Sequence, residues 1–178
     1  MSTTVAVVLY SGELDVCYAQ FYVVAAPADK WVDMNVAFAG QTNGLCGSGQ
    51  AGRLFFVTGT HTGSVRLAVE YTAARPDVED AWEEQVECSF EVKSAPTVLV
   101  DWEGQLSHVL QLSPRTYRVR YSARGMLADS DAEPSPYELQ SYRVQFWPEP
   151  SRPDEILRVH GECAKYWHAE VAKSSGAS

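Results

Sequence analysis

The chain has 178 residues, 46% of them hydrophobic, and a formal net charge of −9, because 23 Asp and Glu outnumber 14 Lys and Arg. A chain of this length buries roughly 70% of its unfolded surface, so one core can form without a disulfide or a metal. The charge argues against direct binding to nucleic acid or to anionic membranes, which requires clustered basic side chains, and it favours a basic partner.

The cysteines and the apolar runs indicate a cytoplasmic protein. None of the four cysteines, which are Cys17, Cys46, Cys88 and Cys163, forms a C-x-x-C pair, so neither a zinc ribbon nor a redox motif is predicted. No apolar run approaches the roughly 20 residues of a membrane-spanning helix, and residues 1–10 lack the basic start of a signal peptide. We therefore expect reduced thiols and no cofactor or metal.

The first 25 residues predict two strands. Residues 3–10 form the first, and Ser11-Gly12 ends it. Residues 15–25 form the second, in which apolar side chains occupy both alternating faces, so both faces are expected to be covered, with Cys17 on an inward one. Residues 29–38 fit a short helix and a loop equally well.

The next segment, residues 40–52, is rich in glycine and predicts a surface loop. It contains Gly47-Ser-Gly49-Gln-Ala-Gly52, a formal G-x-G-x-x-G. A dinucleotide site needs that motif between a strand and a helix, whereas a strand-like segment follows it here. A nucleotide site is therefore disfavoured.

Two β-hairpins are predicted in the middle of the chain, because alternating apolar segments flank glycine-containing turns. They comprise residues 53–58 with 64–72, and residues 96–102 with 105–112. A further strand follows Pro114 and runs to Tyr121. The Pro-containing turn before Tyr117 is typical of the corner of Greek-key sandwiches.

The last strand is predicted at residues 137–147, and a helix is predicted at residues 152–171. Ser151 can cap this helix, and Asp154 and Glu155 fill its positive first turn. The chain thus predicts a mostly β fold, an antiparallel β-sandwich of about eight to nine strands with one C-terminal helix.

The domain organisation follows from this order of elements. Residues 1–150 are expected to form the sandwich domain, and residues 151–178 a helix that packs on, or extends from, the same domain. Parallel α/β folds are disfavoured, because helices do not alternate with strands.

Residues 77–92 predict both a strand and a charged surface. Their second half alternates with the period of a half-buried strand, whose apolar positions are Val86, Cys88, Phe90 and Val92. Their first half is acidic without any Lys or Arg, which is either a solvated face or a surface for a basic partner. Trp82 would anchor that partner or cover a sheet edge. The predicted partner-binding residues are Asp77, Glu79, Asp80, Trp82, Glu83, Glu84, Glu87 and Glu91.

Five arginines are expected on outward strand faces, where exposed pairs with the glutamates would contribute about 0–1 kcal/mol each. They are Arg115, Arg118, Arg120, Arg124 and Arg143.

Catalysis is a weaker hypothesis than binding. His160 and Cys163 lie three apart on the predicted helix, so their side chains can meet, but a cysteine nucleophile also needs an oxyanion donor. Cys163 fits the apolar stripe of that helix as well. The dense acidic run does not resemble two carboxylates facing across a glycosidase cleft. His168 is expected to be solvated at the helix edge.

Ligand binding is the second alternative. Asp129, Asp131 and Glu133 have the spacing of a calcium loop, without its glycine turn or its terminal glutamate. Residues 40–52 and 127–136 are the candidate loops for calcium or a small ligand.

Four short motifs carry a resemblance to a known family. They are Cys17-Tyr-Ala-Gln20-Phe21-Tyr-Val23, Trp31-x-Asp33, Val86-x-Cys88-x-Phe90-x-Val92 and Leu112-x-Pro114-x-x-Tyr117. Through them, about residues 15–125 resemble the competence protein J family of nuclease inhibitors. The resemblance implies a β-sandwich fold and nuclease inhibition, although the loop at residues 127–136 and the terminal helix depart from that family.

The sequence as a whole favours a non-enzymatic, acidic inhibitor or immunity-type protein that neutralises a basic nuclease or toxin. The alternative is a β-sandwich module that binds calcium or a small ligand. Nucleic acid and membranes are not expected as direct partners, and a homodimer is left open.

Overall fold

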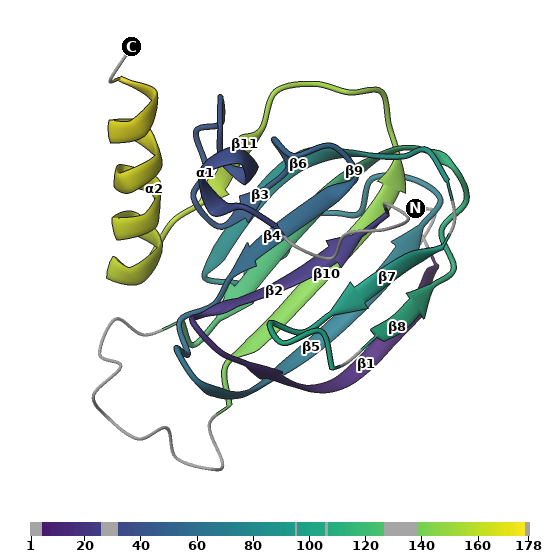
Figure 1. Cartoon of the computed structure of the whole chain (residues 1–178), viewed down its shortest axis with the longest axis horizontal. Coiled ribbons are helices and arrows are strands. Elements are labelled where there is room, and N and C mark those ends of the chain that lie inside the picture. Colours follow the sequence, from purple (N-terminus) through teal and green to yellow (C-terminus); the bar gives the residue numbers. More distant parts are fainter. Residues whose placement is uncertain (1–4, 26–31, 95, 106, 127–138, 177–178) are drawn as a thin grey trace.

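The computed structural model describes residues 5–25, 32–94, 96–105, 107–126 and 139–176. These residues form eleven strands in two facing sheets, together with two helices (Figure 1). The expected mostly β sandwich with a C-terminal helix is confirmed, with more strands than the eight to nine predicted. Neither helix in this part of the chain is long and apolar enough to cross a bilayer.

The strands of the larger sheet are, in spatial order, β1 (Ala6–Val16), β5 (Gly63–Thr72), β10 (Ser141–Pro148), β9 (Arg115–Arg124), β6 (Glu84–Val92) and β11 (Glu155–Arg158). Those of the smaller sheet are β3 (Cys46–Gly47), β4 (Arg53–Val57), β2 (Gln20–Val24), β7 (Thr97–Val100) and β8 (Ser107–Leu110). Neighbours pair antiparallel, except that β5 and β10 are parallel. The helices are α1 (Met34–Ala37) and α2 (Glu162–Ser175).

The core lies between the two sheets, and β6 turns its apolar side chains into it as predicted. Its four apolar positions are at most 3% exposed: Val86, Cys88, Phe90 and Val92. Across the interior, Phe56 of β4 lies edge-on to Tyr121 of β9, with ring centroids 5.0 Å apart. Such aromatic pairs add to the stabilisation that burial provides.

The corner predicted before Tyr117 is present at the entry to β9. The Tyr117 hydroxyl donates a hydrogen bond of 2.7 Å to the carbonyl oxygen of Ser113, four residues upstream. This bond fixes the turn that carries the chain from the smaller sheet into the larger one, as a tyrosine corner does in other sandwiches.

The first strand is longer than expected. β1 continues through Ser11-Gly12 to Val16, because β5 pairs with it along its whole length and satisfies its backbone groups. The chain turns at residues 17–19 instead, where Tyr18 and Ala19 adopt positive φ angles of 55° and 56°. The prediction of an inward Cys17 on a strand is wrong, because Cys17 lies in this turn and is only half-buried.

One of the two predicted hairpins is confirmed. β7 and β8 pair directly, whereas β4 and β5, predicted as the other hairpin, belong to different sheets. The turn between β4 and β5 carries the chain from one layer of the sandwich to the other. Local alternation identified both strands but held no information on their partners.

The short helix α1 settles the ambiguity at residues 29–38, as far as these are described. Asp33 caps it, accepting a hydrogen bond of 2.8 Å from the backbone N–H of Asn35. Residues 26–31 lie outside the described part of the chain, and with them Trp31 of the resemblance motif.

The predicted helix at residues 152–171 is wrong in its first ten residues. Glu155–Arg158 instead form β11, which pairs with the edge of β6, and α2 begins at Glu162 after Gly161. Asp154 does not fill a first helical turn, because its carboxylate accepts hydrogen bonds from the backbone N–H groups of Thr42 and Asn43. Edge pairing and these distant contacts outweigh the local helix signal.

Helix α2 packs backbone to backbone on the loop at residues 40–52. His168 is only 9% exposed, and its Nδ1 accepts a hydrogen bond of 2.9 Å from the N–H of Gly44. The expectation of a solvated His168 is therefore wrong. Burial lowers the pKa of His168, and the nearby Asp154 carboxylate only partly opposes this shift.

This histidine predicts a pH dependence. Because its pKa is lower in the folded state, the unfolded chain binds more protons below about pH 6.5, so stability falls as pH decreases through that range. We expect the melting temperature to decrease from pH 7.5 to pH 5.5. His168→Gln, which offers an amide oxygen to Gly44, should flatten this part of the profile. An unchanged slope in the variant would contradict the assignment.

Candidate protein-binding surface

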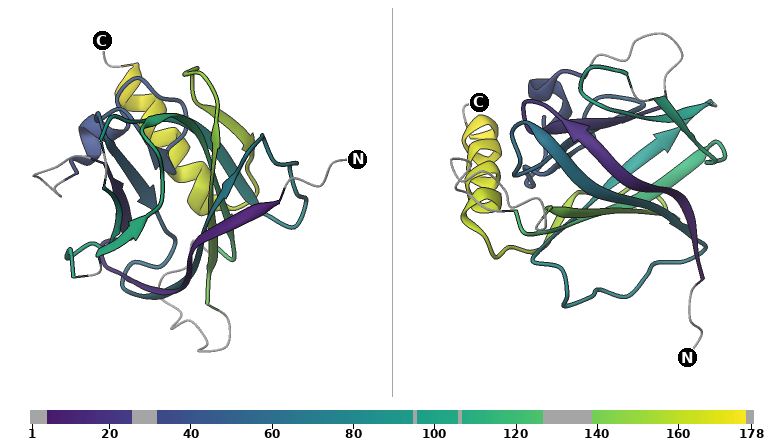
Figure 2. Two further views of the ribbon diagram at one scale, coloured as in Figure 1. Left: turned by 90° about the vertical axis from the view of Figure 1, so that its right-hand side faces the viewer. Right: turned by 90° about the horizontal axis from the view of Figure 1, so that it is seen from below.

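The acidic stretch predicted from the sequence forms a strap across the outside of the larger sheet. We call residues 73–83 the acidic strap. They connect β5 to β6, which are separated in the sheet by β10 and β9. The connection passes over the outer face of these two strands, as the view from below in Figure 2 shows.

Arginines of the sheet hold the acidic strap in place. Arg120 Nη1 donates a hydrogen bond of 2.8 Å to the carbonyl oxygen of Asp77. Arg143 forms an ion pair of 2.7 Å with Glu79, and Arg158 of β11 contacts both the carboxylate and the carbonyl oxygen of Asp80. The strap is thus fixed at three successive points.

Trp82 lies close to two guanidinium groups on this face. The carbon centres of Arg143 and Arg124 lie 4.8 and 5.6 Å from its ring centroid. Its indole also lines a shallow cavity of about 330 Å³ with Ser11 and Tyr142. Cation–π contacts of this kind contribute roughly 0.5–1 kcal/mol at exposed sites, so they help to fix the end of the strap.

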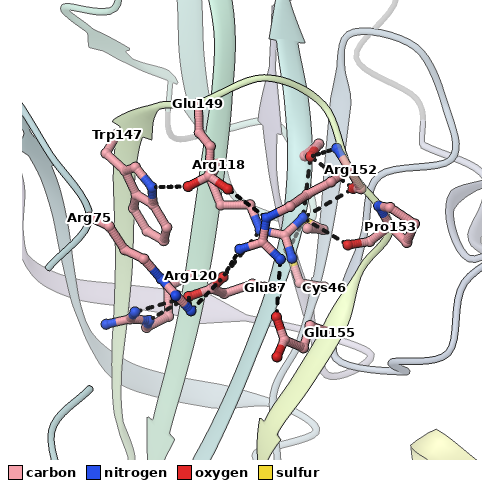
Figure 3. Close-up of polar contacts among 12 residues, drawn as sticks. Cys46, Arg75, Glu87, Arg118, Arg120, Trp147, Glu149, Arg152, Pro153 and Glu155 are labelled. Carbon is pink, nitrogen blue, oxygen red and sulfur yellow. Dashed lines mark hydrogen bonds and ion pairs between the residues drawn. The ribbon is translucent and has the colours of Figure 1, made fainter. Parts of the chain in front are cut away.

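Glu87 lies at the centre of an arginine cluster (Figure 3). It is fully buried and pairs with Arg118 at 3.1 Å and with Arg120 at 2.9 Å, two side chains that are also fully buried. The partly exposed Arg75 and Arg152 complete the cluster at 3.2 and 3.0 Å. The expectation that Arg118 and Arg120 are exposed is therefore wrong.

The charge balance at Glu87 is set by these arginines. Burial raises the pKa of this carboxyl group, but hydrogen bonds from Arg120 and Arg118 outweigh it, so the pKa lies below its ordinary value. Glu87 is thus ionised in the folded protein and compensates cations that would otherwise be buried without a partner.

The link between β10 and β11 also covers the cluster on the outer face of the sheet. Arg118 Nη1 donates to the carbonyl oxygens of Arg152 and Pro153 at 3.1 and 3.0 Å. The Trp147 indole N–H donates to Glu149, which also pairs with Arg152. Segments distant in sequence therefore seal the outer face of the sheet.

The eight predicted partner-binding residues differ in exposure: some are buried, some are half-buried and some are exposed. The prediction that Glu84 and Glu87 are exposed is wrong, because these residues are only 1% and 0% exposed. Glu84 accepts hydrogen bonds from the N–H groups of His160 and Gly161 just before α2. Glu83 is half-buried, and its carboxylate accepts a hydrogen bond from the N–H of Gly125.

The exposed acids are fewer than expected. Asp77, Glu79 and Asp80 remain exposed together on the strap, beside the half-buried Trp82. Glu91 is exposed at the other end of β6, next to Lys93. A role for these residues in binding stays a prediction.

Sequence reasoning missed the residues that organise this face. A glutamate in the middle of β6 and two arginines two positions apart on β9 are partners in the observed register: Glu87 opposes Arg120. Opposite charges at such cross-strand positions are a signal for an ion cluster. This signal depends on which strands pair, and strand pairing is not encoded in local alternation.

His160 and Cys163, the pair weighed for catalysis, lack the features of an activated thiol. Burial raises the pKa of Cys163, and the carboxylate of Glu84 raises it further. A cysteine nucleophile requires the opposite shift. His160 contributes its backbone N–H to Glu84.

The glycine motif at residues 47–52 does not form a phosphate cradle. The N–H of Ser48 donates to Gln41 at 2.6 Å, and the N–H of Gly49 donates to the carbonyl oxygen of Ala37 at 2.7 Å. Phosphate binding requires such amides to be free. Within the described residues, no three metal-binding side chains lie close enough to hold an ion, and residues 127–136 lie outside that part.

Two solved structures have a similar architecture. ComJ from Bacillus subtilis, an inhibitor of the DNA degrading activity of NucA, matches with a TM-score of 0.53 and 14% identity over 82% of this chain and 99% of ComJ. The chain has the ComJ fold. The product of crocagin biosynthetic gene J matches equally, with a TM-score of 0.53 and 15% identity over the same shares of the two chains.

Sequence comparisons add nothing to this structural likeness, since no family model and no curated protein matches the chain. The resemblance drawn from the four short motifs is nevertheless confirmed at the level of the fold. One protein with the ComJ fold inhibits a nuclease and another belongs to a biosynthetic gene set, so the fold alone does not select a function.

Proposed function

We propose that this chain is a non-enzymatic inhibitor or immunity-type protein that binds a basic protein, such as a nuclease or toxin, through the acidic strap. The observation that carries the proposal is the clamping of the strap by Arg120, Arg143 and Arg158, which leaves Asp77, Glu79 and Asp80 exposed at fixed positions. ComJ, which shares the fold, inhibits NucA.

The strap suits recognition because it is organised before a partner arrives. Fixing side chains in advance lowers the entropy cost of association. The Asp80 side chain is 94% exposed although it pairs with Arg158, so its carboxylate can accept a further cation. Carboxylates in such positions can replace nucleic-acid phosphates in a basic active site.

The arginines also limit what charge alone contributes. Glu79 pairs with Arg143 and Asp80 pairs with Arg158, so the strap presents less negative charge to a partner protein than its sequence indicates. Specificity is then expected from the positions of the carboxylates and of Trp82, and the overall net charge of −9 would mainly accelerate the encounter.

The test screens basic nucleases as candidate partners, beginning with any encoded by neighbouring genes, with cleavage of plasmid DNA as the readout. The triple variant Asp77→Lys, Glu79→Lys, Asp80→Lys should raise the inhibition constant about tenfold or more. A matched variant, Glu103→Lys, Glu162→Lys, Glu170→Lys, changes the net charge equally at exposed or half-exposed positions away from the strap.

The control should leave inhibition nearly unchanged. Equal losses in both triple variants would show that overall charge, and not the strap, determines binding. Lack of inhibition by the parent chain, with no complex in gel filtration, would overturn the proposed function.

A small ligand is the second candidate, favoured by one observation. A cavity of about 530 Å³ lies between α1 and α2, lined by Phe38, Trp167 and Val171 with Gly40 at its edge. Its size and its mixed lining, in which Asn35 and Glu170 accompany the aromatic side chains, suit a small molecule with polar and apolar parts, such as a sugar. Calorimetry against calcium and common sugars addresses the alternative, and heat of binding without a protein partner would favour it.

A further inference from the structure

Two cysteine thiols meet in the core between the sheets. The sulfur atoms of Cys46 in β3 and Cys88 in β6 lie 3.3 Å apart, although the residues are 42 positions apart in sequence. Both residues are fully buried. Because β3 belongs to the smaller sheet and β6 to the larger one, this contact joins the two layers of the sandwich.

The backbone positions around the pair are well determined. The N–H of Cys46 donates to the side chain of Asn43 at 2.8 Å, and Cys46 pairs in register with Phe56 of β4. Cys88 pairs with Val119 inside the larger sheet. The sulfur atoms would have to approach by only about 1.3 Å to reach the length of a disulfide bond.

We propose that Cys46 and Cys88 form an intersheet disulfide when the chain meets a low-molecular-weight disulfide such as oxidised glutathione. The Cys46 thiolate attacks one sulfur of that disulfide and releases one thiol, which leaves a mixed disulfide on Cys46. Cys88 then attacks the Cys46 sulfur and releases the second thiol. The two protein thiols lose two electrons and two protons, which the small disulfide gains as two thiols.

The structure indicates which thiol reacts first and why the reaction is slow in the folded protein. β3 has only two residues and is the edge strand of its sheet, whereas β6 lies inside the larger sheet. Local opening of β3 therefore exposes Cys46 more readily than Cys88. Burial raises the pKa of the Cys46 thiol, and contact with Cys88 raises it further, so little thiolate is present while the core is closed.

The bond would stabilise the region that carries α2. β3 lies in the loop at residues 40–52, and this loop binds α2 through Gly44 and His168. A covalent link from β3 to β6 would anchor the loop to the larger sheet. It would also restrict the unfolded chain over the segment between the two cysteines.

The test uses the full chain with Cys17→Ser and Cys163→Ser, so that only the two core thiols remain. Incubation with oxidised glutathione should yield a product 2 Da lighter that resists alkylation until it is reduced, with a Cys46–Cys88 cross-linked peptide. Low urea concentrations should accelerate its formation. The melting temperature should rise by about 5–15 °C relative to the reduced protein.

Controls separate this assignment from non-specific oxidation. Adding Cys88→Ala to the same background should leave Cys46 as a free thiol or a glutathione adduct, without the rise in melting temperature. The proposal would be overturned if the double variant still had two alkylatable thiols after incubation with oxidised glutathione in urea and return to buffer. A cross-link that lowers the melting temperature would also overturn it, because the core would then not accommodate the bond.

Discussion

Replacing Glu87 by Gln is expected to lower the free energy of unfolding by about 3–5 kcal/mol, as removal of one partner from a buried ion cluster does. The variant leaves the buried guanidinium groups of Arg118 and Arg120 without a compensating charge, and its amide group places a donor against other donors. Urea unfolding followed by tryptophan fluorescence measures the difference, because Trp147 lies 5.3 Å from the Arg120 guanidinium.

The matched control is Glu91→Gln, on the same strand and the same face. Glu91 is exposed and pairs only loosely with Lys93 at 3.7 Å, so this change should stay within about 0.5 kcal/mol. Equal effects of the two substitutions would show that the buried cluster is not a stabilising unit.

The effect of Glu87→Gln should also depend on pH. The pKa of Glu87 is lower in the folded protein, so its contribution is complete above the ordinary glutamate value of about 4.3 and is lost as pH falls through the folded value. Parent and variant should therefore converge in stability under acidic conditions. A difference that persists unchanged into strong acid would rule out ionisation of Glu87 as its source.

Gly44→Ala is expected to detach α2 and to cost about 3 kcal/mol or more. A Cβ atom at Gly44 would lie 2.2 Å from the carbonyl oxygen of Trp167 and 2.9 Å from the backbone nitrogen of His168. These are backbone atoms of α2, so no side-chain rotation relieves the overlap. The helix must shift, and the hydrogen bond from Gly44 to His168 is then lost.

Hydrogen exchange across residues 162–175 measures this detachment. Gly176→Ala at the end of α2 is the matched control, because its φ is −87° and the nearest atom to an added Cβ is 3.6 Å away. The control should keep the protection of α2, and Gly44→Ala should lose it. Equal protection in both variants would contradict the close packing of α2 on this loop.

The sequence alone determined much of the scaffold. Alternation on β6 identified its core side, since every second residue of a strand points to the same face. The turn before Tyr117 predicted the corner, and the glycine turn between β7 and β8 predicted their hairpin. These signals depend on neighbours in sequence, so they survive without knowledge of the fold.

Tertiary structure decided the partner of each strand and the cover of the outer face. β4 and β5 look like a hairpin but lie in different sheets, and β11 has a helical pattern but completes the edge of β6. Periodicity shows which residues of a strand share a face. It does not show which strand pairs with it or which segment covers that face, because these lie far along the chain.

The acids of the predicted binding surface show the same division. The sequence predicted one exposed acidic surface between Asp77 and Glu91, but only the fold separates Asp77, Glu79 and Asp80, which remain exposed, from Glu84 and Glu87, which are buried. Burial of a carboxylate requires cations or hydrogen-bond donors beside it; for Glu84 these are the backbone N–H groups of His160 and Gly161. For Glu87 these are Arg118 and Arg120, which strand pairing brings from more than 30 positions away.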